Sequence, residues 1–259
     1  MPAPVLPIAG QSHVVGRREP ALLQSTIGQC LTEAARRWPQ REALIVRHQG
    51  IRWSYAQFDE AVDAVAAHLL DLGLAPGDRI GIWAPNGAEW ALTQFAAARA
   101  GLVLVTINPA YRRHELEHVL NSVACRALVL APSFKSSDYV GILGSLAPEL
   151  ADSTPGELHA ARLPHLRYVI LTGAQAQPGM LAFDALRTPA DAQALAELAC
   201  VAASLDPSQP INIQFTSGTT GAPKGATLSH RNILNNGFFV GEAMRFSEQD
   251  RLCIPVPLY

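Results

Sequence analysis

The sequence has no close pair of cysteines and no long apolar run, and each absence excludes a class of protein. Its four cysteines, Cys30, Cys125, Cys200 and Cys253, lie far apart without a Cys-x-x-Cys pair, which argues against a disulfide framework and a thiolate zinc site. No window approaches the roughly 20 apolar residues of a transmembrane helix, and no basic leader precedes a long apolar core at the N-terminus. We therefore expect a cytoplasmic protein without a transmembrane segment.

An excess of charge of either sign is also missing. The 259 residues include 20 Lys and Arg against 22 Asp and Glu, a formal net charge of -2, and the basic residues occur singly or in pairs. This distribution does not predict the clustered basic surface that binds nucleic acid, so we expect no nucleic-acid partner. With 49% hydrophobic residues, the chain is long enough for one large domain or two modest ones.

Regular structure is predicted after a Pro- and Gly-rich segment, residues 1–24, which suits an extended arm. A helix at 26–38 and a hairpin of 42–47 with 51–55 follow, and Ser54 with Gln57 predicts the capping box of a long helix that ends at Gly73. Strands and helices then alternate, with strands at 78–84, 102–107 and 126–131 and helices at 88–101 and 113–122. This alternation indicates an α/β fold whose mostly parallel sheet is covered by helices.

The second half of the sequence is less regular. Residues 132–210 contain a predicted strand at 166–171 and a helix near 190–199, and we expect surface connections elsewhere in this region. Strands at 211–215 and 225–229 and a helix at 230–244 complete the predicted elements. We expect Trp38, Trp53, Trp83 and Trp90 to belong to the core, and the cysteines to pack as small apolar side chains.

A polar, glycine-rich loop connects the last two predicted strands, in the stretch QFTSGTTGAPKGATLSH at 214–230. Glycines 218, 221 and 225 allow the backbone to approach a ligand closely. Inward N–H groups, four hydroxyls and the Lys224 ammonium suit a polyphosphate, which is anionic and offers only acceptors. The loop is not a Walker A motif, because Lys224 follows Pro223 and precedes Gly225. Composition alone leaves a surface loop without function equally open.

The stretch TSGTTGAPKGATLSH, at 216–230, resembles the phosphate-loop signature of the acyl-adenylate-forming (AMP-binding) superfamily. Residues 77–121, 231–239 and 254–259 are similar to the N-terminal core of the same superfamily. Together they most resemble bacterial fatty-acyl-CoA synthetases, close to the type called acyl-CoA synthetase family member 2. The resemblance implies the N-terminal large domain of the adenylate-forming enzymes, an α/β fold with mostly parallel sheets, incomplete at the C-terminus.

The activity implied by the resemblance is fatty-acid–CoA ligation with ATP, Mg²⁺ and coenzyme A. A fatty carboxylate attacks the α-phosphate of ATP, and the thiol of coenzyme A then displaces AMP. The resemblance assigns the β- and γ-phosphates to the loop and gives Lys224 a catalytic role. The implied nucleotide-binding residues are Thr216, Ser217, Gly218, Thr219, Thr220, Gly221, Ala222, Pro223 and Lys224.

The same resemblance predicts the domain organisation: an arm at 1–24 and a partial N-terminal AMP-binding domain at 25–259. We find no counterpart of the family's later adenine- and ribose-binding segments or of its C-terminal, lysine-bearing domain. We therefore expect this chain alone to lack the complete activity. A fatty acid is the expected substrate, while acyl chain length, peripheral membrane contact and oligomeric state are left open.

Two other functions compete with this one. HELEH, His114 to His118, fits the HExxH pattern of zinc hydrolases, with the two histidines as ligands, Glu115 as general base and Glu149 as a third ligand. The alternative is a solvated helix face with Leu116, Val119 and Leu120 turned to the core. The other competing function is a non-catalytic binding protein derived from a synthetase by truncation. The roles of Asn86, Asn108 and His230, at the site or in local turns and caps, are also left open.

Overall fold

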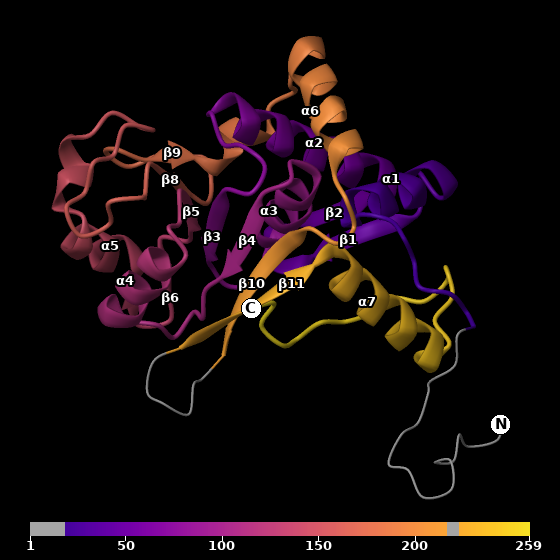
Figure 1. Cartoon of the computed structure of the whole chain (residues 1–259). Coiled ribbons are helices and arrows are strands. Elements are labelled where there is room, and N and C mark those ends of the chain that lie inside the picture. Colours follow the sequence, from indigo (N-terminus) through magenta and orange to yellow (C-terminus); the bar gives the residue numbers. More distant parts are fainter. Residues whose placement is uncertain (1–18, 217–222) are drawn as a thin grey trace, which may run out of the picture.

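A computed structural model describes residues 19–216 and 223–259 (Figure 1). The helices are α1 Ile27–Arg37, α2 Tyr55–Asp71, α3 Ala88–Arg99, α4 Arg113–Ser122, α5 Tyr139–Leu146, α6 Ala192–Ser204 and α7 His230–Met244. Within the described residues, the 3₁₀ turns are η1 Arg47–Gln49, η2 Pro148–Asp152 and η3 Phe183–Arg187. The strands are β1 Glu42–Val46, β2 Ile51–Ser54, β3 Arg79–Trp83, β4 Val103–Thr106, β5 Ala127–Leu130, β6 Ser133–Phe134, β7 Ser137–Asp138, β8 Tyr168–Leu171, β9 Leu181–Ala182, β10 Pro210–Thr216 and β11 Lys224–Ser229.

The central sheet has seven strands in the order β11-β10-β4-β3-β5-β8-β9. Every neighbouring pair from β10 to β9 is parallel, and only β11 runs antiparallel, at one edge. All residues of β4 and β5 are buried, as expected for parallel strands covered on both faces. The prediction of an α/β fold with a mostly parallel sheet is therefore confirmed.

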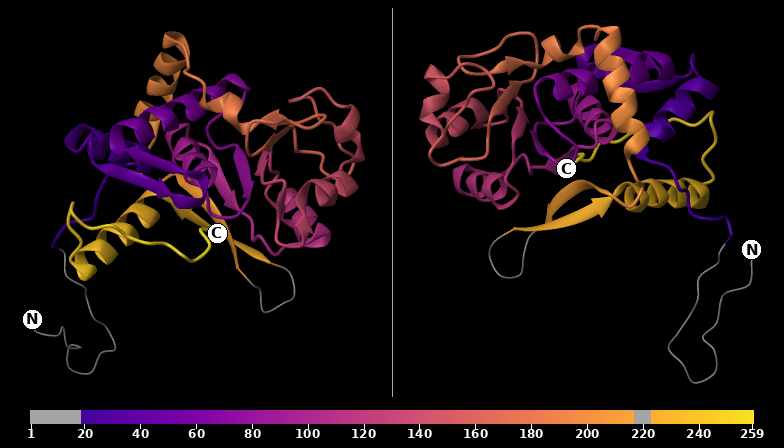
Figure 2. Two further views of the ribbon diagram at one scale, coloured as in Figure 1. Left: turned by 180° about the vertical axis from the view of Figure 1, so that it is seen from behind. Right: turned by 45° about the horizontal axis from the view of Figure 1, so that its top comes forward.

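Helices cover the sheet in two groups (Figures 1 and 2). One group contains α1, α2, α3 and α6, which contact one another, and the other contains α4 and α5. Strands β4 and β5 lie on opposite sides of β3. Because crossovers between parallel strands are right-handed, α3 and α4 must then lie on opposite faces of the sheet.

Local capping signals predicted the start of α2 correctly. The Ser54 hydroxyl accepts a hydrogen bond from the Gln57 amide, and the Gln57 side chain accepts one from the Ser54 amide. Gly73, one residue beyond the C-cap Leu72, has a φ of 86°, a conformation that favours glycine. The apolar face of the helix, Phe58, Val62, Val65 and Leu69, is buried in the main core.

The strand predicted at 166–171 and the helix predicted near 190–199 are present as β8 and α6, but the expectation of surface connections elsewhere in 132–210 is wrong. This region contributes α5 and two fully buried aromatic side chains, Tyr139 and Phe183. The Tyr139 ring stacks on Trp83 with 3.7 Å between centroids, and its hydroxyl donates to the Pro109 carbonyl at 2.7 Å. Because α5 has only eight residues and two glycines, its helical pattern was too short to recognise from periodicity.

The tryptophan and cysteine expectations were met only in part. Trp83 and Trp90 are buried, whereas Trp38 and Trp53 are half-buried. Cys125 is buried, and burial raises the pKa of its thiol to about 12. The other three cysteines are exposed, because they occupy outward positions of α1 and α6 or the segment after α7. In the described residues, no helix has the length and apolarity needed to cross a bilayer.

Candidate functional site

Strands β10 and β11 form an antiparallel hairpin, and the predicted polyphosphate loop lies between them in the sequence. Thr216 is paired with Lys224, and Phe215 with Gly225, in antiparallel register. The Thr216 hydroxyl also donates to the Lys224 carbonyl at 3.4 Å. The hairpin therefore brings the first and last predicted phosphate-binding residues together. Of the nine residues assigned to the site, Ser217, Gly218, Thr219, Thr220, Gly221 and Ala222 lie outside the described residues.

The hairpin extends past the carboxyl end of the parallel sheet. Gln214 of β10 is opposite Thr106, the last residue of β4, so Phe215 and Thr216 continue beyond that strand. In open α/β sheets, ligands bind outside the carboxyl ends of the strands. Lys224 is exposed there, so its ammonium group is accessible to an anionic ligand.

Gly225 lets the two strands pack closely at this position. A Cβ atom on residue 225 would lie 2.9 Å from Cγ2 of Ile213 and 3.4 Å from the Phe215 ring. The Ile213 methyl group is on a β-branched side chain with little rotameric freedom. Any larger residue at position 225 would therefore push the strands apart.

Helix α4 reaches the hairpin through His118. The ring Nε2 of His118 lies 3.4 Å from the carbonyl oxygen of Pro223, the residue before β11. The opposite side of α4 is in the core, because Leu116, Val119 and Leu120 are buried, as the alternative to the zinc hypothesis expected. The contact joins residues 105 positions apart, and no local sequence pattern predicts it.

The family model described as "AMP-binding enzyme" matches residues 31–259, which is most of the chain and includes the whole hairpin. The chain belongs to the AMP-binding enzyme family. Membership agrees with the resemblance carried by residues 216–230.

Curated members of the AMP-binding family match almost the full chain. The medium-chain acyl-CoA ligase ACSF2, mitochondrial, of Mus musculus is 45% identical over 98% of this chain and 42% of its own length. The human protein of the same name shows the same identity and coverage. A putative acyl-CoA synthetase, YngI of Bacillus subtilis, is 41% identical over 92% of this chain and 43% of its own length. The chain therefore spans about two-fifths of the length of these relatives.

Solved structures of the family share the fold. MbtA of Mycobacterium smegmatis superposes with a TM-score of 0.67 at 28% identity, covering 87% of this chain and 38% of that one. The N-terminal domain of FACL13 from Mycobacterium tuberculosis gives a TM-score of 0.64 at 23% identity, covering 90% of this chain and 52% of that one. The second likeness shows the fold alone, and it agrees with the predicted fold class.

The geometry gives no support to a zinc site at HELEH. The Glu115 carboxylate accepts a hydrogen bond from the Arg112 amide at the start of α4, at 3.1 Å, and Glu149 accepts one from the Ala161 amide at 3.0 Å. Ranges 19–216 and 223–259 contain no cluster of three or more His, Cys, Asp and Glu side chains arranged to bind a metal. His118, proposed as one of the zinc ligands, contacts the Pro223 carbonyl beside the hairpin.

His230 and Asn108 have local structural roles. The His230 ring is buried at the start of α7, where Nδ1 accepts a hydrogen bond from the Ile27 amide at 3.2 Å. Burial lowers the pKa of His230 to about 4, so the ring is neutral. Asn108 accepts from the Ala110 amide at 2.8 Å in the turn after β4. These contacts favour the helix-start and turn roles over contact with a ligand.

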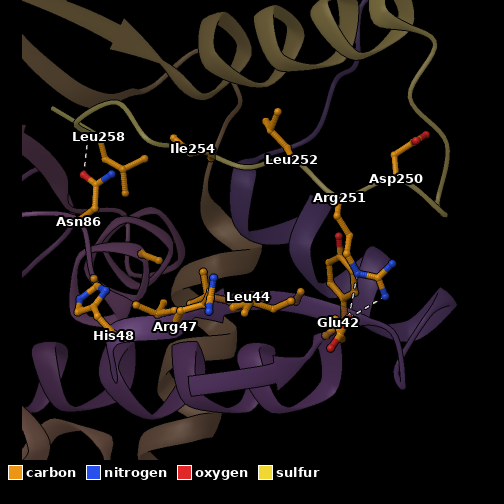
Figure 3. A pocket seen from close by; sticks show the side chains of 16 residues that line it. Glu42, Leu44, Arg47, His48, Asn86, Asp250, Arg251, Leu252, Ile254 and Leu258 are labelled. Atoms are coloured by element: carbon orange, nitrogen blue, oxygen red, sulfur yellow. Dashed lines mark hydrogen bonds and ion pairs between the residues drawn. The ribbon is translucent and has the colours of Figure 1, made fainter. Parts of the chain in front are cut away.

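A separate pocket of about 530 Å³ lies between the β1–β2 hairpin and residues 250–258 (Figure 3). The Asn86 side chain donates to the Val256 carbonyl and accepts from the Leu258 amide, at 2.8 and 2.9 Å. Across the pocket, Arg251 donates to Glu42 at 2.7 Å, and hydrogen bonds from Arg52 and Arg251 lower the pKa of the Glu42 carboxyl. No lining residue comes from β10 or β11, so this pocket is distinct from the candidate phosphate site.

Proposed function

We propose that this chain supplies the polyphosphate-binding hairpin and the surrounding α/β core of an AMP-forming fatty-acyl-CoA ligase. The observation that carries the proposal is the pairing of Thr216 with Lys224 beyond the carboxyl end of the sheet. The names of the matched relatives, medium-chain acyl-CoA ligase and putative acyl-CoA synthetase, support the reaction class. A fatty acid is accordingly the proposed substrate, and the cytoplasm remains the proposed location.

The proposed reaction has two steps. A fatty carboxylate oxygen attacks the α-phosphorus of ATP, the bond to the bridging oxygen breaks, and pyrophosphate leaves. The sulfur of coenzyme A then attacks the acyl carbon, and AMP leaves with the former carboxylate oxygen. In such chemistry the protein positions the reacting groups and stabilises developing charge.

Lys224 is the proposed residue for the charge on the outer phosphates. Its ammonium is a compact point charge on a flexible stem, and pairing with Thr216 fixes the backbone from which that stem extends. Mg²⁺ commonly enters such sites bound to substrate phosphates with few protein ligands. The metal is therefore proposed to arrive with ATP. The chain alone is proposed to bind polyphosphate without completing the two-step reaction.

Lys224 can be tested by covalent labelling, because the sequence contains only two lysines, Lys135 and Lys224. Both are accessible for reaction, and Lys135 lies near Phe134 on the strand pair β6–β7. An ATP analogue with an aldehyde in place of the γ-phosphate, followed by borohydride reduction, should label Lys224 preferentially. Excess Mg·ATP should protect Lys224 and leave any slow labelling of Lys135 unchanged.

The matched variants Lys224→Ala and Lys135→Ala complete the experiment. Lys224→Ala should weaken Mg·ATP binding by about tenfold or more, the scale of one lost charge-assisted hydrogen bond, whereas Lys135→Ala should bind as the wild type does. Equal labelling of the two lysines, or equal affinity of the two variants for Mg·ATP, would contradict the proposed function.

A further inference from the structure

We propose that His118 is a positioning residue for the phosphate-binding hairpin. Its ring Nε2–H donates to the Pro223 carbonyl and so fixes the peptide group that leads into Lys224. The consequence for nucleotide binding rests on the proposed function, whereas the hydrogen bond itself does not.

The acceptor belongs to the same peptide group as the Lys224 amide. The carbonyl of residue 223 and the N–H of residue 224 lie in one plane and point in opposite directions across a trans peptide. Pro223 has no N–H of its own, so its carbonyl is the only main-chain group through which it can be held. A donor at that oxygen therefore sets the direction in which the Lys224 N–H points.

Lys224 is held from its other side by Thr216. The Thr216 hydroxyl donates to the Lys224 carbonyl, and the two residues are paired in the β10–β11 register. His118 thus fixes the peptide group before Lys224, and Thr216 fixes the group after it. Together the two contacts restrict the backbone that carries the lysine stem.

Helix α4 is a rigid base for the His118 ring. Arg162 donates to both carboxylate oxygens of the neighbouring Glu117, at 2.8 and 2.5 Å, and this pairing lowers the pKa of the Glu117 carboxyl. The Asn121 side chain donates to the Arg162 carbonyl at 2.9 Å. A donor on a firmly packed helix loses little conformational freedom when it bonds to the hairpin, so more of its binding energy remains available for positioning.

To donate this hydrogen bond, the histidine ring must carry a proton on one particular nitrogen. A carbonyl only accepts hydrogen bonds, so Nε2 must carry the proton. A glutamine side chain places an amide N–H at about the position of Nε2, and an asparagine side chain is too short to do so. His118→Gln should therefore keep the contact, while His118→Leu and His118→Asn should lose it. His114, exposed one turn earlier on the same helix, provides the control His114→Leu.

The first measurement is made without ligand, by nitrogen-15 NMR of the full 259-residue chain. The His118 ring should show the Nε2–H tautomer. The amide nitrogen resonance of Lys224 should shift in His118→Leu and His118→Asn and return toward the wild-type position in His118→Gln. An unchanged Lys224 resonance in the first two variants, or the same shift in all three, would overturn the proposal. If His118→Leu fails to fold, the difference in the Lys224 resonance between His118→Asn and His118→Gln decides whether the contact exists.

The second measurement is calorimetric titration with Mg²⁺ and tripolyphosphate. We expect His118→Leu to weaken binding by about three- to tenfold, the equivalent of one net hydrogen bond, with His118→Gln and His114→Leu close to the wild type. Equal binding by all variants would overturn the positioning role. If the wild-type chain itself binds no tripolyphosphate, the proposed function is wrong for this chain, and the NMR result still decides the His118 contact.

Discussion

The imidazole of His230 is enclosed where the first turns of α1 and α7 meet, with 1% of the residue exposed. Burial lowers the pKa of the ring from 6.5 to about 4, because the charged form loses its hydration. The unfolded chain therefore binds a proton at a higher pH than the folded chain does. The stability contributed by the neutral ring is complete above about pH 6.5 and is lost as the pH falls toward 4.

His230→Asn tests this pH dependence, because asparagine places an acceptor near the Nδ1 position and does not titrate. Between pH 7 and about 4, the free energy of unfolding of the wild type should fall by roughly 2–3 kcal/mol more than that of the variant. Denaturant unfolding at a series of pH values measures the difference. The exposed His165→Asn should follow the wild type, and parallel curves for wild type and His230→Asn would disprove the assignment.

Most of the single residues whose roles the sequence left open have distant partners, and Asn108, with its local turn contact to Ala110, is the exception. His230 meets Ile27 across 203 positions, His118 meets Pro223 across 105, and Asn86 holds Leu258 across 172. The helix predicted at 113–122 is confirmed as α4 and carries His118, but the pattern did not indicate what the His118 ring contacts. Lys224 is proposed for the site because it lies in the short stretch at 216–230 that resembles the family's phosphate loop, and composition alone did not separate that role from a surface loop without function.

Among the elements, the β10–β11 hairpin contains one glycine, Gly225, whose replacement is expected to lower the free energy of unfolding. The Cβ of Gly225→Ala would lie 2.9 Å from Ile213 Cγ2, closer than carbon atoms approach without strain. We expect the variant to lower the free energy of unfolding by about 1–3 kcal/mol, as overpacking does, and to weaken Mg·tripolyphosphate binding by shifting Lys224. Chemical denaturation and calorimetry measure the two effects.

Gly237→Ala in α7 provides the control of opposite sign. A Cβ at Gly237 meets no atom within 4 Å, and alanine is favoured over glycine in a helix by about 1 kcal/mol. This variant should be slightly more stable than the wild type, with unchanged polyphosphate binding. If Gly225→Ala is as stable as Gly237→Ala, the β10 and β11 strands do not pack as closely at residue 225 as the structure shows.

The elements that sequence patterns predicted well have strong local signals. The capping boxes of α2 and α7 and the apolar face of α2 involve only residues close in sequence, and β3, β4 and β5 are apolar runs bounded by turns. Strands β6, β7 and β9 have two residues each, too few for any alternation to show. Their strand conformation depends on pairing with neighbours, which the local sequence does not encode.

At the scale of the whole molecule, large apolar side chains are exposed mainly in one segment of the described chain. Of the ten large hydrophobic residues exposed in the described chain, seven lie between 239 and 256, in α7 and the segment that follows it. They are Phe239, Val240, Met244, Phe246, Leu252, Ile254 and Val256. Exposed apolar side chains that are concentrated in one segment, and are not scattered singly, favour contact with other polypeptide.

We therefore expect this chain to self-associate in solution, through the surface formed by these seven residues. Sedimentation velocity across the micromolar range should show oligomers in the wild type and a shift toward monomer in the double variant Met244→Gln/Val256→Gln. Met244 and Val256 are 56% and 62% exposed, so the substitutions remove apolar surface without opening the core. Leu195→Gln, on α6 and 39% exposed, is the matched control and should associate as the wild type does. A wild-type chain that stays monomeric at every concentration, or a control that dissociates as readily as the double variant, would show that this surface is not the contact.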